Sequence, residues 1–202
     1  MNVEWGIENF DIVCGFSSEP PGWRDQVELI SRLSRKLEVL EEEKRAINDE
    51  IRSNEVLGSQ IKRTVENSVA SIRHKEKFFT HVENVEKITA LLLRLSHQLN
   101  RVQSELSNAD TRDYAADQKQ AYLQERFRQL LCQLQDAREI KKMLDVRSYQ
   151  VIDILHSVMT ENQLADYQYF IQMKSKLLID GDEIENKIKL GKSQREALKR
   201  SL

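Results

Sequence analysis

The chain has 202 residues, of which 40% are hydrophobic and 32% are charged, yet it contains only two prolines and six glycines. This composition is typical of long, solvated helices, because a compact domain uses more glycine and proline in its turns. The net charge of −2 gives no field that favours nucleic acid or an anionic membrane, and no apolar run approaches the ~20 residues of a membrane span.

Residues 1–25 are expected to form a tail or linker, since they are rich in glycine and end near a Pro-Pro-Gly break. Residues 26–202 are expected to form one helical domain. Asp25 and Glu28 have the spacing of a capping box, which predicts that the first helix begins near Gln26. The acidic tail lacks the basic residues of a signal peptide, so we expect a cytoplasmic protein with no membrane insertion.

A first helix is predicted over residues 26–107, because apolar residues recur there at alternating three- and four-residue steps, the spacing of a coiled-coil seam. The seam runs through Ile30, Leu33, Leu37, Leu40, Lys44, Ile47, Ile51, Asn54, Gly58, Ile61, Val65, Ser68 and Ile72. Lys44, Asn54 and Gly58 put polar or small groups on it, which weakens the seam and limits the registers it accepts.

The stretch 87–106 of this helix carries more apolar surface than one seam requires. Its seam consists of Leu92, Leu95, Leu99, Val102 and Leu106. Leu93, Arg94, His97 and Arg101 are expected on the outer face, away from this seam. A mixture of apolar and guanidinium groups is enriched at protein interfaces, so this face predicts a second partner.

A turn is predicted over residues 107–117, which are rich in Asn, Asp, Ser and Thr. Seam spacing resumes in a second helix over residues 113–158. The seam residues of this second helix include Leu130, Leu134, Leu144, Val151 and Leu155. Thr160 and Gln163 form a further candidate capping box, which predicts a third helix over residues 161–201.

An aromatic patch, Tyr167, Tyr169 and Phe170, opens the third helix. We interpret it as a packed helix junction, in preference to an anchor for another protein. Glycines on the seam of this helix permit close backbone approach or bending.

Catalytic and metal-binding motifs are missing from the sequence. There is no P-loop, nucleophile elbow or repeated Glu-x-x-His ligand set, although His74 and His81 are seven residues apart. Cys14 and Cys132 are far apart, as expected for free thiols in a reducing compartment. We therefore expect no enzyme activity, no cofactor and no metal.

The expected fold is all-α and elongated. A first helix of ~80 residues would be about 120 Å long, and the second and third helices together match that length. An intramolecular hairpin would bury these seams, but dimerisation closes them more economically.

Five segments carry a specific resemblance to a known family. They are RKLEVLEEEK at 35–44, NEVLG at 54–58, LLLRLSHQLNRV at 91–102, LADYQYFIQMKS at 164–175 and ENKIKLG at 185–191. From about Val27 to Leu202 the chain resembles the C-terminal Shroom domain, the second Apx/Shroom homology domain of the Shroom cytoskeletal proteins. The family's central pattern is similar to LSGRLARVE, which Leu95, Ser96, Leu99, Arg101 and Val102 match, and from which His97, Gln98, Asn100 and Gln103 depart.

The resemblance implies a segmented antiparallel coiled-coil homodimer that binds the coiled coil of Rho-associated kinase. The expected role is a cytoskeletal scaffold that directs actomyosin contraction in apical constriction and cell morphogenesis, at apical cell junctions. The expected kinase-binding residues are Leu93, Arg94, Ser96, His97, Gln98, Asn100 and Arg101. The expected dimer seam is Leu92, Leu95, Leu99, Val102, Leu106, Leu130, Leu134, Leu144, Val151 and Leu155. The full-length protein is expected to associate with actin through regions outside this chain.

Two alternatives remain. A spectrin-like actin-binding protein would show a repeat of about the length of a three-helix bundle, and the sequence contains no internal repeat. A membrane-associated structural coiled coil would need a basic face, which the mixed charges do not supply.

Overall fold

The computed structural model describes residues 23–108 and 114–201. Apart from its last three residues, the predicted tail of residues 1–25 lies outside the described residues. The helices in the described residues are α1 (Trp23–Ser68), α2 (Ile72–Ser107), α3 (Tyr114–His156) and α4 (Glu161–Arg200). The all-α fold class is confirmed, since each of these elements is a helix.

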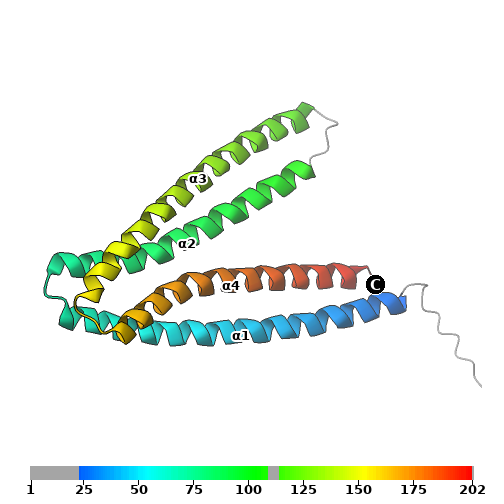
Figure 1. Ribbon diagram of the computed structural model, residues 1–202. Helices are drawn as coiled ribbons and strands as arrows, with labels where there is room; N and C mark the ends of the chain where they lie inside the picture. Colours follow the sequence, from blue (N-terminus) through cyan, green and yellow to red (C-terminus); the bar gives the residue numbers. More distant parts are fainter. Residues whose placement is uncertain (1–22, 109–113, 202) are drawn as a thin grey trace, which may run out of the picture.

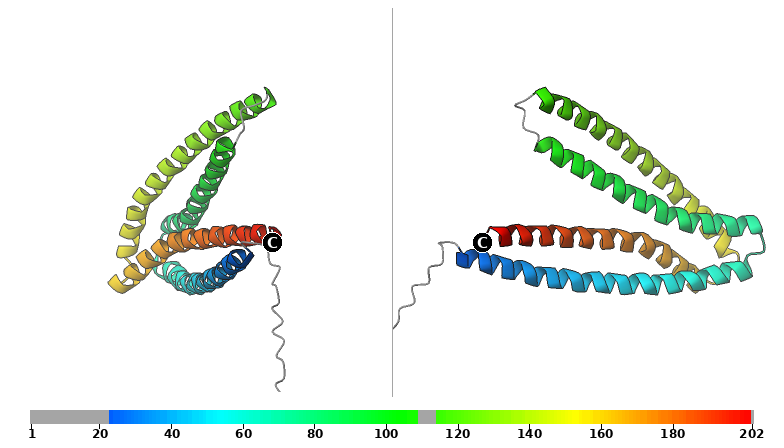
Figure 2. Two further views of the ribbon diagram at one scale, coloured as in Figure 1. Left: turned by 90° about the vertical axis from the view of Figure 1, so that its right-hand side faces the viewer. Right: turned by 180° about the vertical axis from the view of Figure 1, so that it is seen from behind.

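The helices pair into two antiparallel hairpins (Figure 1). α1 lies along α4, and we call this pair the α1/α4 hairpin, although its helices are not consecutive. α2 lies along α3 in the α2/α3 hairpin. The start of α1 and the end of α4 therefore lie side by side. Figure 2 shows that the hairpins meet at one end and diverge from there. We call the meeting point the junction. The seams of the described residues are thus closed within one chain, and the predicted homodimer stays a prediction.

The prediction of a single helix over residues 26–107 is wrong. The first helix ends at Ser68, and a second helix, α2, begins at Ile72. The Ser71 side chain caps α2 by accepting a hydrogen bond from the His74 backbone N–H at 3.4 Å. Lys75 Nζ donates to the Glu66 carbonyl at 2.6 Å, which satisfies an orphan carbonyl at the end of α1. Both new helix ends are therefore provided with partners.

The break also shifts the seam. Val65 and Val69 are buried, whereas Ser68 is exposed and Ile72, the last residue of the predicted seam, is 74% exposed. α1 is consequently about 70 Å long, at 1.5 Å per residue, rather than the 120 Å expected for an unbroken helix.

A single apolar cluster fills the junction, and all four described helices contribute to it. Its buried members are Ile61, Val65, Val69, Phe78, Val82, Val151, Leu155, Tyr167 and Phe170. The rings of Phe78 and Tyr167 lie 5.7 Å apart, and both side chains are fully buried. This confirms the interpretation of Tyr167 and Phe170 as a packed junction, while Tyr169 is 56% exposed.

The α1/α4 hairpin is closely packed at two glycines. Gly58 of α1 lies against the ring of Phe170, and a Cβ at Gly191 of α4 would lie 2.9 Å from Leu37 Cδ2. Buried Asn54 donates from Nδ2 to the Phe170 carbonyl at 3.2 Å. The exceptions in the predicted seam are therefore points of close contact between the two helices.

The α2/α3 hairpin has a leucine core. Leu95, Leu130, Leu134 and Ala137 are buried in it, with Leu91, Leu92, Leu99 and Val102 packed around them. Its helices end and begin within the predicted turn of residues 107–117, of which residues 109–113 lie outside the described residues.

The remaining helix ends agree partly with the predictions. The Thr160–Gln163 capping box is confirmed, with hydrogen bonds of 3.0 and 3.3 Å in the two directions. α1 begins at Trp23, so Asp25 lies inside the first turn instead of capping a helix that starts near Gln26.

Candidate functional site

The candidate docking surface lies on the second half of α2. We call it the α2 face and define it as Leu93, Arg94, Ser96, His97, Gln98, Asn100 and Arg101. Arg94, His97, Gln98, Asn100 and Arg101 are exposed, while Leu93 and Ser96 are partly buried. Most of the predicted residues thus share one solvent-accessible part of a helix, which a docking surface requires.

The α2 face is not wholly free, because His97 touches α4. His97 Nε2 lies 2.8 Å from Asp182 Oδ2 and 3.1 Å from Asn186 Nδ2. Asn186 Nδ2 also donates to Asp182 Oδ2 at 3.1 Å. If Nε2 carries a proton, the histidine donates to Asp182 and all three groups are satisfied. His97 is therefore exposed as predicted, and it is also engaged with α4 within the chain.

Further contacts between α2 and α4 lie closer to the junction. Lys174 Nζ binds Glu86 Oε2 at 2.8 Å, and the lysine side chain is only 22% exposed. Thr89 Oγ1 lies 3.5 Å from Ser175 Oγ, at the limit of a hydrogen bond. These contacts hold the hairpins together near the junction, and His97 extends them along α2. Sequence spacing gave no signal for any of these contacts, since the partners are more than 80 residues apart in the chain.

Two arginines of the α2 face remain available to a partner. Arg94 is an exposed residue, and it makes no hydrogen bond or ion pair with the described residues. Arg101 Nε binds Glu105 Oε1 at 2.9 Å, one helical turn along, and the arginine side chain is 82% exposed. An exposed pair at this spacing contributes about 0.3 to 0.5 kcal/mol, so it is easily exchanged for another carboxylate.

The residues of the predicted dimer seam lie on the inner sides of α2 and α3. Leu95, Leu130, Leu134, Leu144, Val151 and Leu155 are buried, while Leu92, Leu99, Val102 and Leu106 are partly buried. The predicted apolar faces are thus correct. In this chain α2 and α3 cover each other, so the assignment of the same residues to a dimer seam stays a prediction.

Sites for other chemistry are also constrained by the structure. Among residues 23–108 and 114–201, no three His, Cys, Asp or Glu side chains gather as they would around a metal ion. In the same ranges, no helix combines the length and apolarity needed to cross a membrane. Cys132 has a free, exposed thiol, and Cys14 lies outside the described residues.

Comparison with known proteins identifies relatives along nearly the whole chain. The family described as Apx/Shroom domain ASD2 matches residues 24–202. Protein Shroom2 of Homo sapiens is 39% identical over 175 residues, covering 87% of this chain and 11% of the relative. Protein Shroom4 of Mus musculus is 37% identical over 177 residues, covering 88% of this chain and 12% of the relative. Protein Shroom of Drosophila melanogaster is 31% identical over 175 residues, covering 87% and 11%. The chain spans about a tenth of the length of these relatives.

Proposed function

The chain belongs to the Shroom family through its Apx/Shroom domain ASD2, and we propose that this helical module docks the coiled coil of a Rho-associated kinase. In this role it is a cytoplasmic cytoskeletal scaffold that localises actomyosin contraction to apical cell junctions. It acts by binding and not by catalysis.

The observation that carries the proposal is the exposure of Arg94 and Arg101 on the α2 face beside partly buried Leu93. Coiled coils carry charged residues, often glutamates, on either side of their apolar seam. A guanidinium binds a carboxylate through two parallel hydrogen bonds, which fixes orientation as well as contributing affinity. The α2 face therefore has suitable groups for the side of a partner coiled coil.

The test is the affinity of the full chain for a recombinant Rho kinase coiled coil, measured by fluorescence anisotropy. We expect Arg94→Ala with Arg101→Ala to weaken binding at least about tenfold, the scale of interface arginines. Helix content and melting temperature are expected to change little, because both side chains are exposed and alanine is a good helix former.

The matched control is Arg63→Ala with Arg138→Ala, which removes two exposed arginines from α1 and α3. This control is expected to bind like the parent. An equal loss in both double variants would indicate a response to net charge alone and would contradict docking on the α2 face. Cosedimentation of the chain with actin filaments would instead support the spectrin-like alternative.

The homodimer is proposed on separate grounds. α3 leaves Ile140, Met143 and Val146 between 42% and 60% exposed, although its inner side is already covered by α2. A second copy would remove this apolar surface from water at a gain of about 25 cal/mol per Å². Light scattering with sedimentation velocity tests this, and a monomer at micromolar concentration would contradict it.

A further inference from the structure

A groove runs between the first turns of α2 and the last part of α3, near the junction. It is lined by Arg73, Glu76, Lys77, Thr80, His81 and Asn84 from α2 and by Leu144, Arg147, Gln150 and Val151 from α3. Its volume is about 410 Å³, within the range of sites that hold small molecules. The α2 face lies further along α2, so the groove is a separate site.

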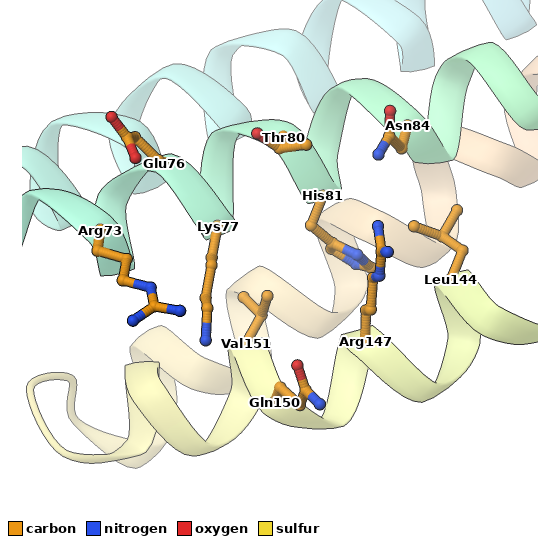
Figure 3. A pocket seen from close by; sticks show the side chains of 10 residues that line it. All are labelled: Arg73, Glu76, Lys77, Thr80, His81, Asn84, Leu144, Arg147, Gln150 and Val151. Atoms are coloured by element: carbon orange, nitrogen blue, oxygen red, sulfur yellow. The ribbon is translucent and has the colours of Figure 1, made fainter.

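The groove gathers cationic side chains that have no counterion. Arg73, Lys77 and His81 follow one another at four-residue steps, and all three point from α2 toward α3 (Figure 3). Arg147 projects from α3 into the same groove. Arg73, Lys77 and Arg147 are the cations of the groove, and they make no ion pair with the described residues. Arg73 and Lys77 are like charges at this spacing, which destabilises a helix, and an anion bound in the groove would offset their repulsion.

His81 is a second, independent sign of a ligand. Its residue is only 4% exposed, yet neither Nδ1 nor Nε2 has a hydrogen-bond partner among the described residues. A buried polar group without a partner is costly, and native proteins seldom retain one without a reason. The ring points toward the groove, so a ligand bound there is placed to satisfy one of its nitrogens once the side chains that close over them move aside.

The nearby carboxylates do not serve as counterions for the cations of the groove. Glu76 lines the groove, but its carboxylate points away from Lys77 and Arg147 (Figure 3) and makes no ion pair with the described residues. Asp145 is held by Lys141 through both carboxylate oxygens, at 3.2 and 2.9 Å. The first turn of α2 also contains no acidic residue, so beyond the Ser71 cap no carboxylate offsets the positive end of its dipole.

We propose that this groove binds a small phosphate ester, held by Arg73, Lys77 and Arg147 over the buried ring of His81. Guanidinium groups bind phosphate oxygens in pairs, and a lysine adds a point charge. Gln150 and Thr80 line the same groove and supply neutral donors for ester or hydroxyl oxygens. The shared chemistry fits both a soluble inositol phosphate and the headgroup of a phosphoinositide lipid.

The test is calorimetric titration of the full chain with inositol 1,4,5-trisphosphate, with citrate, a carboxylate trianion of lower charge, as the comparison. We expect saturable binding of the trisphosphate and at least about tenfold weaker binding of citrate. Vesicles that contain phosphatidylinositol 4,5-bisphosphate form the second arm, so binding to them but not to the soluble headgroup assigns the lipid as the source. Absence of binding in both arms, or equal affinity for citrate, overturns the proposal.

Two variants locate the site. Lys77→Gln with Arg147→Gln is expected to weaken binding at least about tenfold, since it removes two of the three cations. The control, Lys62→Gln with Arg138→Gln, changes the net charge equally at exposed residues outside the groove. His81→Leu is expected to fold at least as stably as the parent and to bind less tightly. A Lys77→Gln with Arg147→Gln variant or a His81→Leu variant that binds like the parent overturns the proposal, and none of these measurements involves the kinase.

Discussion

The two hairpins achieve the same antiparallel pairing by different means. In α1/α4 the interface contains buried Asn54, glycine contacts and ion pairs between the helices, such as Lys192–Glu41 at 2.7 Å. In α2/α3 the interface is a run of leucines, and within the described residues no ion pair or hydrogen bond joins the two helices. The first hairpin thus has fixed points, whereas the second relies on burial.

This difference separates register from stability. Gly58 leaves room for the Phe170 ring, and Asn54 donates to the Phe170 carbonyl. Both contacts form in only one alignment of α1 against α4. A leucine seam stabilises each alignment that keeps the leucines facing inward. The alignment of α1 with α4 is therefore more narrowly defined than the alignment of α2 with α3.

The largest expected effect comes from truncating the leucine seam. Leu130 is fully buried, so Leu130→Ala is expected to lower the free energy of unfolding by about 2 to 5 kcal/mol. The loss combines buried apolar area with a cavity that long, stiff helices close poorly. Urea denaturation followed by circular dichroism measures the change.

The neighbouring Leu131 provides the control, since it is 44% exposed on the same helix. Leu131→Ala is expected to change the unfolding free energy by less than about 0.5 kcal/mol, as surface substitutions usually do. Equal losses at the two positions would contradict the pairing of α2 with α3, and would point to a second chain over Leu131.

The next effect contrasts two glycines of α1/α4. A Cβ at Gly58 would collide with the Phe170 ring, whereas at Gly181 the nearest atom, Ile47 Cγ2, is 3.8 Å away. Gly58→Ala is therefore expected to destabilise the chain by about 1 to 2 kcal/mol, despite alanine's higher helix propensity. Gly181→Ala is expected to stabilise it by up to about 1 kcal/mol.

The two Gly→Ala substitutions are thus expected to change the stability of the chain in opposite directions. Thermal melts of both variants, recorded at one protein concentration, are sufficient to read them. If Gly58→Ala also raises the melting temperature, Phe170 does not pack against α1 and the register of the first hairpin is different.

Much of the fold follows from local sequence. Seam spacing correctly marked the buried side of each helix, for instance Leu37, Leu134 and Leu155. The break at Val69–Ser71 was missed, because valine, alanine and serine are tolerated inside helices and no glycine or proline marks the site. The position of this helix break is set by packing in the junction core, which brings together residues about 100 apart in the sequence.

The candidate sites show the same limit. Spacing placed Arg94 and Arg101 correctly on the exposed part of α2, but it did not reveal that His97 meets Asp182. The cationic groove was missed as well, since Arg147 belongs to a different helix from Lys77. Heptad spacing identifies which face of a helix is apolar, and it does not identify which helix covers that face.

The smallest expected effect is a difference in pH dependence between the hairpins. Burial lowers the pKa of His81 from its ordinary value of 6.5, and the Asp145 carboxylate partly opposes this. In α1/α4 the hydrogen bond from Lys192 lowers the pKa of Glu41 below its ordinary value of 4.5. The two groups therefore respond to acid in different pH windows.

The direction in which stability changes with pH follows from the difference in proton binding between the folded and unfolded chains. Just below pH 6.5 the unfolded chain protonates His81 before the folded chain does, so stability falls as the pH drops from 6.5 through the folded pKa. The contribution of Glu41 is lost only below pH 4.5. Melting temperatures measured from pH 7.5 to 5.0 should therefore decline less in His81→Leu than in the parent, while His74→Gln, at an exposed position of α2, declines like the parent. Parallel curves for His81→Leu and the parent would mean that the His81 ring is already protonated or hydrated in the folded chain, because only a buried, neutral ring produces the difference.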